Sequence, residues 1–185
     1  MRIERSVLLP CPAPRCVQAL QTPQTMCYVA HPMLRFVPLS PPAWPPRWEA
    51  QRYRVAVRFF GLLPMGTQQI NISWLDRSAE FGHLHVEMQD HGCGTFMSRW
   101  DHTITVQACQ EACRYTDRVD IAAGLLTPLV WLFAWCLFWH RQRRWKRLVA
   151  HGMDLAARKW VGGSAGGGRA RQHGPTRAAS RDVSK

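Results

Sequence analysis

The chain of 185 residues has the length of one domain with a tail to spare. Its composition, 46% hydrophobic and 19% charged, excludes a wholly disordered or fibrous chain. The formal net charge is +12, but residues 141–185 hold twelve basic and two acidic residues and so carry +10 of it. A basic end on a nearly neutral body argues against a specific nucleic-acid-binding domain and predicts only non-specific charge.

The first forty residues have the pattern of a strand, two short helices and a second strand. Ile3 to Leu8 is a β-like run, and Ala13 to Ala30 is helical in pattern, with Pro23 dividing it in two. Leu34 to Leu39 is another brief strand. Five prolines from Pro38 to Pro46 then exclude regular structure and predict an extended surface connection.

Apolar and polar residues alternate with period two through most of residues 52–121. The positions that we expect to share the covered face are Tyr53, Val55, Val57, Phe59, Ile70, Ile72, Trp74, Leu84, Val86, Met88, Trp100, His102, Ile104, Val106, Tyr115, Asp117, Val119 and Ile121. Consecutive alternating strands with short turns predict an antiparallel meander with one face covered.

The last predicted element is a long helix. Gly124 breaks the strand pattern, and Thr127-Pro128 is typical of a helix start. From Leu129 to Trp139 the helix is apolar on every side, and from His140 to Met153 it is amphipathic. We therefore predict one domain over residues 1–155 and a basic, Gly/Ala/Arg-rich disordered tail over residues 156–185.

The uncharged run from Ile121 to Trp139, with arginines behind it, is a pattern that membrane spans also show. Because the helix starts near Thr127, its apolar part is under about 20 Å long, against a hydrocarbon core of about 30 Å. We therefore predict a buried helix. Leu132 and Trp139 need a further cover, which the short helices, a second copy of the chain or a bilayer surface would supply.

The order of elements predicts a two-layer α+β domain. It resembles the helix-grip fold of the START-like superfamily, also called SRPBCC or Bet v 1-like, and in particular its bacterial polyketide cyclase/dehydrase-like members. Four motifs carry the resemblance: Leu34-Arg35-Phe36-Val37, Phe60-Gly61-Leu62-Leu63-Pro64, Trp100-Asp101-His102 and Thr116-Asp117-Arg118-Val119.

The resemblance implies a curved antiparallel sheet of about seven strands around a long C-terminal helix, with two short helices after the first strand. It also implies a cavity that binds a hydrophobic small molecule such as a lipid, isoprenoid or polyketide, or else a cyclase or dehydratase activity. The expected ligand-binding residues are Tyr53, Val57, Phe59, Ile72, Trp74, Val86, Met88, Trp100, His102, Tyr115, Val119, Trp131, Trp135 and Phe138.

His102 and Asp117 are the candidate catalytic residues. A two-residue turn at Cys109-Gln110 would place them opposite each other on neighbouring strands, where the carboxylate would orient the imidazole as a general base. A hydrogen-bonded pair with a purely structural role has the same pattern and stays open as the alternative.

His83 and His85 share one strand face near His91 and Cys93, but the spacing favours a solvated histidine face over a metal site. No Cys-x-x-Cys pair and no signal-peptide core occur, so we expect reduced thiols, a cytoplasmic location and no cofactor. Besides the ligand, the expected partners are a second copy of the chain and an anionic membrane. The membrane contacts would come from Arg141, Arg143, Arg144, Lys146 and Arg147.

Overall fold

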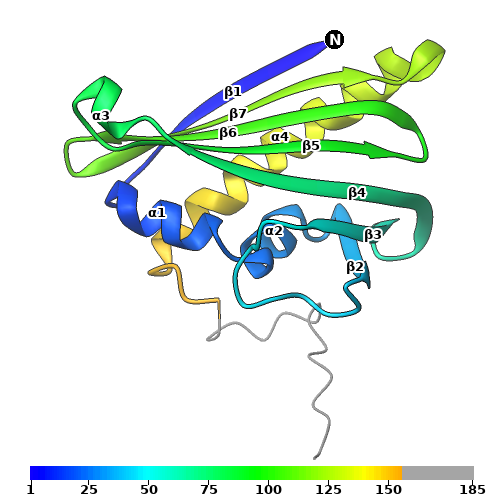
Figure 1. Ribbon diagram of the computed structural model, residues 1–185, viewed down its shortest axis with the longest axis horizontal. Coiled ribbons are helices and arrows are strands. Elements are labelled where there is room, and N and C mark those ends of the chain that lie inside the picture. Colours follow the sequence, from blue (N-terminus) through cyan, green and yellow to red (C-terminus); the bar gives the residue numbers. More distant parts are fainter. Residues whose placement is uncertain (156–185) are drawn as a thin grey trace, which may run out of the picture.

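The computed structural model describes residues 1–155 (Figure 1), and the predicted tail of residues 156–185 lies outside the described residues. The elements in chain order are β1 Arg2–Leu9, α1 Ala13–Leu20, α2 Pro23–Ala30, β2 Leu34–Ser40, β3 Arg52–Phe59, β4 Leu63–Asp76, α3 Ser78–Phe81, β5 His85–Gly94, β6 Met97–Cys109, β7 Ala112–Ala122, a 3-10 turn Gly124–Leu126 and α4 Thr127–Ala150. The predicted α+β helix-grip architecture is confirmed.

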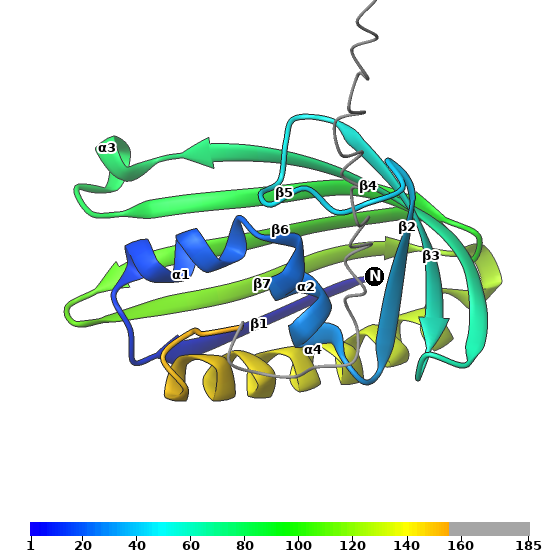
Figure 2. The ribbon, with the colours of Figure 1, turned by 90° about the horizontal axis from the view of Figure 1, so that it is seen from below.

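The seven strands form one antiparallel sheet in the order β1-β7-β6-β5-β4-β3-β2. The sheet curves, and its concave side holds α1, α2 and α4 (Figures 1 and 2). Helix α4 runs along β1 and β7 and also packs against α2. Because β1 pairs with β7, the first and last strands lie together under the C-terminal helix.

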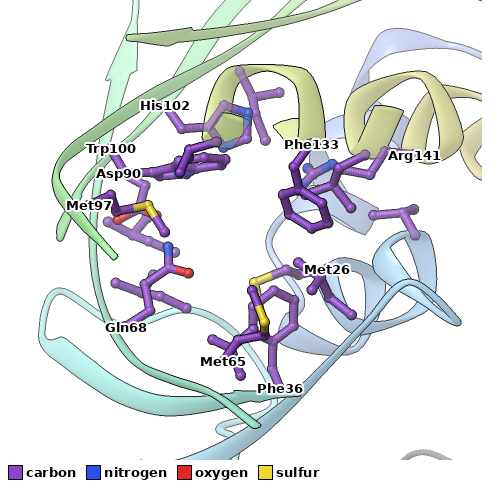
Figure 3. Close-up of a pocket in the computed structure, with 18 of the residues that line it drawn as sticks. Met26, Phe36, Met65, Gln68, Asp90, Met97, Trp100, His102, Phe133 and Arg141 are labelled. Atoms are coloured by element: carbon purple, nitrogen blue, oxygen red, sulfur yellow. The ribbon is translucent and has the colours of Figure 1, made fainter. Parts of the chain in front are cut away.

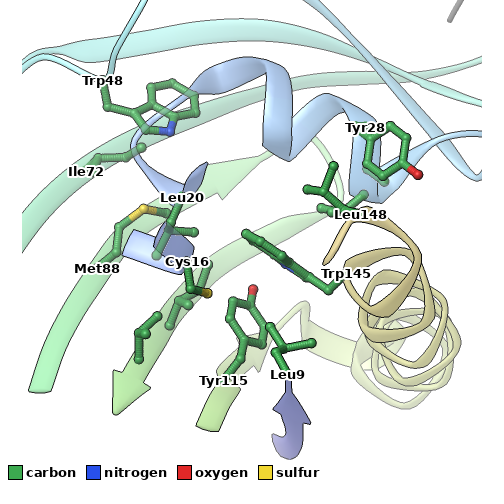
Figure 4. Close-up of a cluster of buried hydrophobic side chains, with 14 of the residues drawn as sticks. Leu9, Cys16, Leu20, Tyr28, Trp48, Ile72, Met88, Tyr115, Trp145 and Leu148 are labelled. Carbon is green, nitrogen blue, oxygen red and sulfur yellow. The ribbon is translucent and has the colours of Figure 1, made fainter. Parts of the chain in front are cut away.

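The buried core falls into two clusters, one along each half of α4. The larger cluster gathers α1, α2, the C-terminal half of α4 and the sheet around Trp145, whose ring lies 5.0 Å from that of Tyr115 (Figure 4). The smaller cluster joins Phe138 to Trp100 and Val119. Helix α4 is therefore fixed to the sheet mainly along the β1–β7 side, where both clusters are filled.

The turn between β6 and β7 differs from the predicted one. It consists of Gln110 and Glu111, so Cys109 is opposite Ala112 and His102 is opposite Val119. Gln110 has a φ of 55°, which a two-residue hairpin turn accommodates. Moving the turn by one residue shifts the register by two, and a shift of two leaves every side chain on its predicted face.

The proline-rich connection between β2 and β3 is only partly the surface segment that we predicted. Trp48 is buried, its ring lies 5.0 Å from that of Tyr53, and its backbone N–H donates to the carbonyl of Gln21 at 2.9 Å. The prolines exclude a strand here, but the tryptophan has too much apolar area to leave in water. The connection therefore covers one end of the space between sheet and helices.

His85 also departs from the predicted solvated histidine face. It is buried, stacked on Phe81 at 4.2 Å, and its Nδ1 lies 3.1 Å from Nε2 of Gln107. The short helix α3, which the sequence pattern did not predict, carries Phe81 over this position. His83 is exposed as predicted.

The outer side of α4 is uncovered in the described part of the chain. Leu132 and Trp139 keep 53% and 40% of their surface exposed, so the short helices do not cover them. The guanidinium of Arg143 lies 3.6 Å from the centre of the Trp139 ring. No helix within residues 1–155 has the length and apolar character that a bilayer crossing requires.

Candidate ligand-binding cavity

A cavity of about 430 Å³ lies between the concave face of the sheet and the helices (Figure 3). Its volume is in the range of small-molecule sites, and most of its wall is apolar. The lining residues are Leu20, Thr25, Met26, Val29, Leu34, Phe36, Trp48, Val57, Met65, Thr67, Gln68, Ile70, Ile72, Met88, Asp90, Thr95, Phe96, Met97, Trp100, His102, Ile104, Leu126, Leu129, Val130, Phe133, Leu137, Arg141 and Trp145.

One end of the cavity opens to solvent. Phe96 in the β5–β6 turn and Leu126 and Leu129 at the start of α4 line it and are exposed. Gly66 of β4, with a φ of 80°, lies so close to Thr95 of the β5–β6 turn that any side chain on the glycine would collide with it. The opposite end is closed by buried side chains such as Trp48, Leu20 and Trp145.

Five of the fourteen residues expected to bind the ligand line this cavity, namely Val57, Ile72, Met88, Trp100 and His102. The other six expected residues on the sheet lie off the wall for local reasons. Tyr53 packs behind Trp48, and Phe59 packs edge-on against Phe133 at 5.8 Å. Trp74 is 36% exposed, and Val86 is half-buried.

Tyr115 and Val119 are buried beneath α4, in the larger and the smaller core cluster respectively. Strand β7 carries these residues on the predicted face, but the helix covers that face directly. Alternation along a strand identifies the concave face of the sheet, and only the position of α4 decides which part of it remains open.

The helix face toward the cavity was predicted wrongly. Trp131 donates from Nε1 to the carbonyl of Arg2 at 3.0 Å, and Trp135 lies under the guanidinium of Arg5 at 5.3 Å. Phe138 is buried beside His102, 4.9 Å between ring centres, but it does not form part of the wall. The residues that α4 turns to the cavity are Leu129, Val130, Phe133, Leu137, Arg141 and Trp145.

A signal for this face was present in the sequence. Trp145 lies on the apolar stripe of the amphipathic half, and steps of four residues back from it reach Arg141, Leu137 and Phe133. The uniformly apolar half has no stripe of its own, so it could not indicate a face. The short helices contribute Leu20, Met26 and Val29, which the sequence pattern did not mark as cavity residues.

Asp117 stands at the centre of a buried polar network behind the cavity wall. Its Oδ1 lies 2.9 Å from Nε2 of His102 and accepts from the Tyr115 hydroxyl at 3.0 Å. The same oxygen lies 3.6 Å from Nη2 of Arg141. The structure therefore brings together the predicted His102–Asp117 pair, although diagonally across the strands and not in the expected register.

Burial lowers the pKa of His102, and the hydrogen bond that the imidazole donates to Asp117 only partly offsets this effect. The imidazole is therefore neutral at neutral pH. With a carboxylate as partner, Nε2 carries the proton and donates, which leaves Nδ1 with a free lone pair. No hydrogen bond to Nδ1 occurs within residues 1–155, and His102 lines the cavity.

Asp90 is a further ionisable residue of the wall, and the sequence reasoning missed it. It continues the inward face of Met88 by two positions along β5, so alternation could have identified it. Its Oδ1 accepts from the backbone N–H of Asn71 at 2.8 Å. Burial raises the pKa of Asp90 to about 7, against the lowering effect of that hydrogen bond and of nearby cations.

Arg141 and Arg144, expected at a membrane surface, have other contacts. Arg141 is 8% exposed and lines the cavity. Arg144 donates from Nη2 to the carbonyl of Tyr28 at 3.2 Å and covers the ring of that tyrosine. Arg143, Lys146 and Arg147 are exposed, as the sequence predicted. Among residues 1–155, no group of three His, Cys, Asp or Glu side chains is placed to hold a metal ion.

A profile described as a domain of unknown function, DUF8410, matches residues 22–149. The chain belongs to the DUF8410 family. The match runs from the start of α2 nearly to the end of α4, so the DUF8410 domain includes every residue of the cavity wall except Leu20. No curated protein matches the sequence of this DUF8410 chain.

Solved structures share the fold of this DUF8410 domain at low sequence identity. A START superfamily protein from Mycobacterium smegmatis has 11% identity and a TM-score of 0.55, with 81% of this chain and 97% of that chain covered. The Zhui aromatase/cyclase from Streptomyces sp. R1128 has 7% identity and a TM-score of 0.56, with 84% and 97% covered.

The structure named Ara h 8.0201 has 9% identity and a TM-score of 0.56, with 82% of this chain and 98% of that chain covered. These three proteins carry different descriptions on one architecture, and the DUF8410 domain has that START-like architecture. At such identities the likeness concerns the fold alone.

Proposed function

We propose that this DUF8410 domain binds a hydrophobic small molecule in the cavity between the sheet and α4. The observation that carries the proposal is the cavity itself, about 430 Å³ in volume, walled mainly by apolar side chains and open at one end. Burying an apolar ligand there would gain roughly 25 cal/mol for each Å² removed from water. The START-like and aromatase/cyclase descriptions of proteins with this fold support the same class of ligand.

A neutral fluorescent probe, N-phenyl-1-naphthylamine, tests the proposal. We expect its emission to rise on binding to the purified full chain and native mass spectrometry to detect any co-purified ligand. Ile72→Trp places an indole in the cavity and should weaken probe binding at least about tenfold, because its side chain lines the wall. Ser73→Trp adds the same indole at the next, exposed position of β4 and serves as the matched control.

Loss of binding in Ile72→Trp alone, with both variants folded, would support the cavity as the binding site. Equal binding by both variants would place the probe elsewhere on the molecule. A wild-type protein that neither binds the probe nor carries a co-purified ligand would contradict the proposed function.

His102 favours a second candidate function, a cyclase or dehydratase reaction on a polyketide-like substrate. Its Nε2 is held by Asp117, and its Nδ1 lone pair would accept a proton from an acidic carbon of the substrate. A turnover screen with poly-β-ketone thioesters tests this candidate. We expect His102→Ala to lose at least about a hundredfold in rate if the imidazole is the base. Turnover that persists unchanged in this variant would exclude it.

A further inference from the structure

Arg141 is the only cation in the cavity wall within the described part of the chain. It extends from α4 beside Phe133, on the side of the cavity across from the strands that carry Asp90 and His102 (Figure 3). Only 8% of Arg141 is exposed. The guanidinium therefore lies in a mostly apolar space, where a charge is costly unless polar groups surround it.

The contacts of Arg141 leave most of its donors unused. A guanidinium has five N–H groups, and the single hydrogen bond that Arg141 makes within residues 1–155 is from Nη2 to the Tyr115 hydroxyl, at 3.4 Å. Asp117 balances the charge from 3.6 Å, but its Oδ1 is already occupied by His102 and Tyr115. Nε of Arg141 is buried and has no partner among the described residues.

We propose that the ligand is an amphipathic carboxylic acid of the fatty-acid type, whose carboxylate is bound by Arg141 inside the cavity. The inference rests on the proposed function and adds the chemical class of the ligand. The planar fork of an arginine matches the two oxygens of a carboxylate better than it matches a single hydroxyl oxygen. The apolar remainder of the wall fits a hydrocarbon body that extends toward the open end.

The other ionisable groups of the wall are compatible with this placement. Asp90 faces the cavity from β5, and in its protonated form it donates a hydrogen bond to a carboxylate oxygen and adds no charge. His102 is neutral and is held by Asp117 on its Nε2 side. A ligand carboxylate would then complete the donor set of Arg141 and, as a neighbouring like charge, would favour the protonated form of Asp90.

The test measures displacement of N-phenyl-1-naphthylamine by dodecanoate, dodecanol and methyl dodecanoate, each below its micelle concentration. For the wild-type chain we expect dodecanoate to bind at least about tenfold more tightly than either neutral compound, because hydrogen bonds to a charged group are worth about 1.5–3 kcal/mol. Arg141→Met should remove this preference, which is measured as the ratio of the affinities for dodecanoate and dodecanol within the same variant. Arg143→Met changes an exposed arginine two residues along the same helix and should retain the preference.

The experiment distinguishes failure of the carboxylate inference from failure of the proposed function. Probe binding with equal affinities for the acid, the alcohol and the ester would overturn the carboxylate inference and leave the proposed function standing. Absence of probe binding by the wild type would overturn both. If circular dichroism shows that Arg141→Met is unfolded, the wild-type preference and the variant Arg141→Lys decide the question. The lysine keeps the charge but not the fork, and it should retain only part of the preference.

Discussion

Asp90 is the cavity residue whose protonation should affect stability most. Its pKa of about 7 means that the folded protein holds the proton at pH values where the unfolded chain, with a pKa of 3.8, has released it. The stability that this residue contributes is therefore complete below about pH 4. It is lost as the pH rises through 7, up to a total of about 4 kcal/mol.

We predict that Asp90→Asn becomes progressively more stable than the wild type between pH 4 and pH 8. The amide oxygen retains the hydrogen bond from Asn71 and carries no charge to desolvate. Urea unfolding at several pH values measures the difference, which should grow by a few kcal/mol. Glu111→Gln, in the exposed β6–β7 turn, is the control and should show a flat difference within about 0.5 kcal/mol.

His102 changes the stability with pH in the opposite direction to Asp90. Only the difference between Asp90→Asn and the wild type therefore isolates the contribution of Asp90. Burial lowers the pKa of His102, and the stability it contributes is lost as the pH falls below its unfolded value of 6.5. A difference between Asp90→Asn and the wild type that does not change with pH would contradict the assignment of a raised pKa to Asp90.

Helix α4 packs one side of its C-terminal half into the core, whereas its outer flank is exposed. Trp145 is fully buried against Tyr115 and the short helices, whereas Trp139 is 40% exposed on the outer side. We predict that Trp145→Ala lowers the free energy of unfolding by about 3–5 kcal/mol, because the change leaves a large cavity. Trp139→Ala should cost less than about 1 kcal/mol.

Urea unfolding followed by circular dichroism measures both variants. The pair is matched in chemistry and lies on the same helix, so helix propensity affects both alike. A larger loss for Trp139→Ala would mean that the outer flank of α4 is covered in solution, as it would be in a dimer, and size-exclusion chromatography would then show a second copy of the chain.

The whole molecule presents an exposed apolar rim around the open end of the cavity. The rim consists of large exposed residues from the passage between β3 and β4, the β5–β6 turn, and the 3-10 turn with the first turn of α4: Phe60, Leu62, Leu63, Phe96, Leu125 and Leu129. Of these, Phe96 and Leu129 also line the cavity. The three segments 58–66, 94–100 and 122–133 contain Arg58 and Arg99 and no acidic residue. Such a rim is suited to an anionic phospholipid surface, from which an apolar ligand would enter the cavity.

We predict that the full chain co-sediments with vesicles of phosphatidylcholine and phosphatidylglycerol, and that salt weakens this binding. Basic residues contribute roughly 1 kcal/mol each near an anionic surface, and the rim leucines contribute the rest when they enter the bilayer. Leu62→Glu should reduce binding at least about tenfold. Trp139→Glu, on the flank of α4, is the control.

A reduction in Trp139→Glu but not in Leu62→Glu would place the contact on the helix flank that the sequence suggested. Absence of sedimentation in the wild type would contradict membrane binding altogether. The exposed basic residues Arg143, Lys146 and Arg147 lie in the C-terminal half of α4, which packs over the closed end of the cavity, so the rim and the basic half would not contact one flat surface together.

Apart from the short helix α3, the sequence by itself determined the order of the elements, and it also determined the faces of the strands and the start of α4. Period-two alternation requires one face of β6 and β7 to be buried, and it assigned His102 and Asp117 to that face whatever the register of the turn. Pro128 marked the start of α4 because proline fits the first turn of a helix, and Pro23 marked the division between α1 and α2. These are local features, set by steric constraints within a few residues.

Only the tertiary structure decided where the open space lies and which charges border it. Tyr115 and Asp90 have the same inward orientation on their strands, yet α4 covers the first and leaves the second facing the cavity. Arg141 lies in a basic stretch of the sequence that is typical of a solvent-exposed helix surface. It is buried instead, because α4 crosses over β7 at this position. Such outcomes depend on the packing of segments distant in the chain, which no local periodicity encodes.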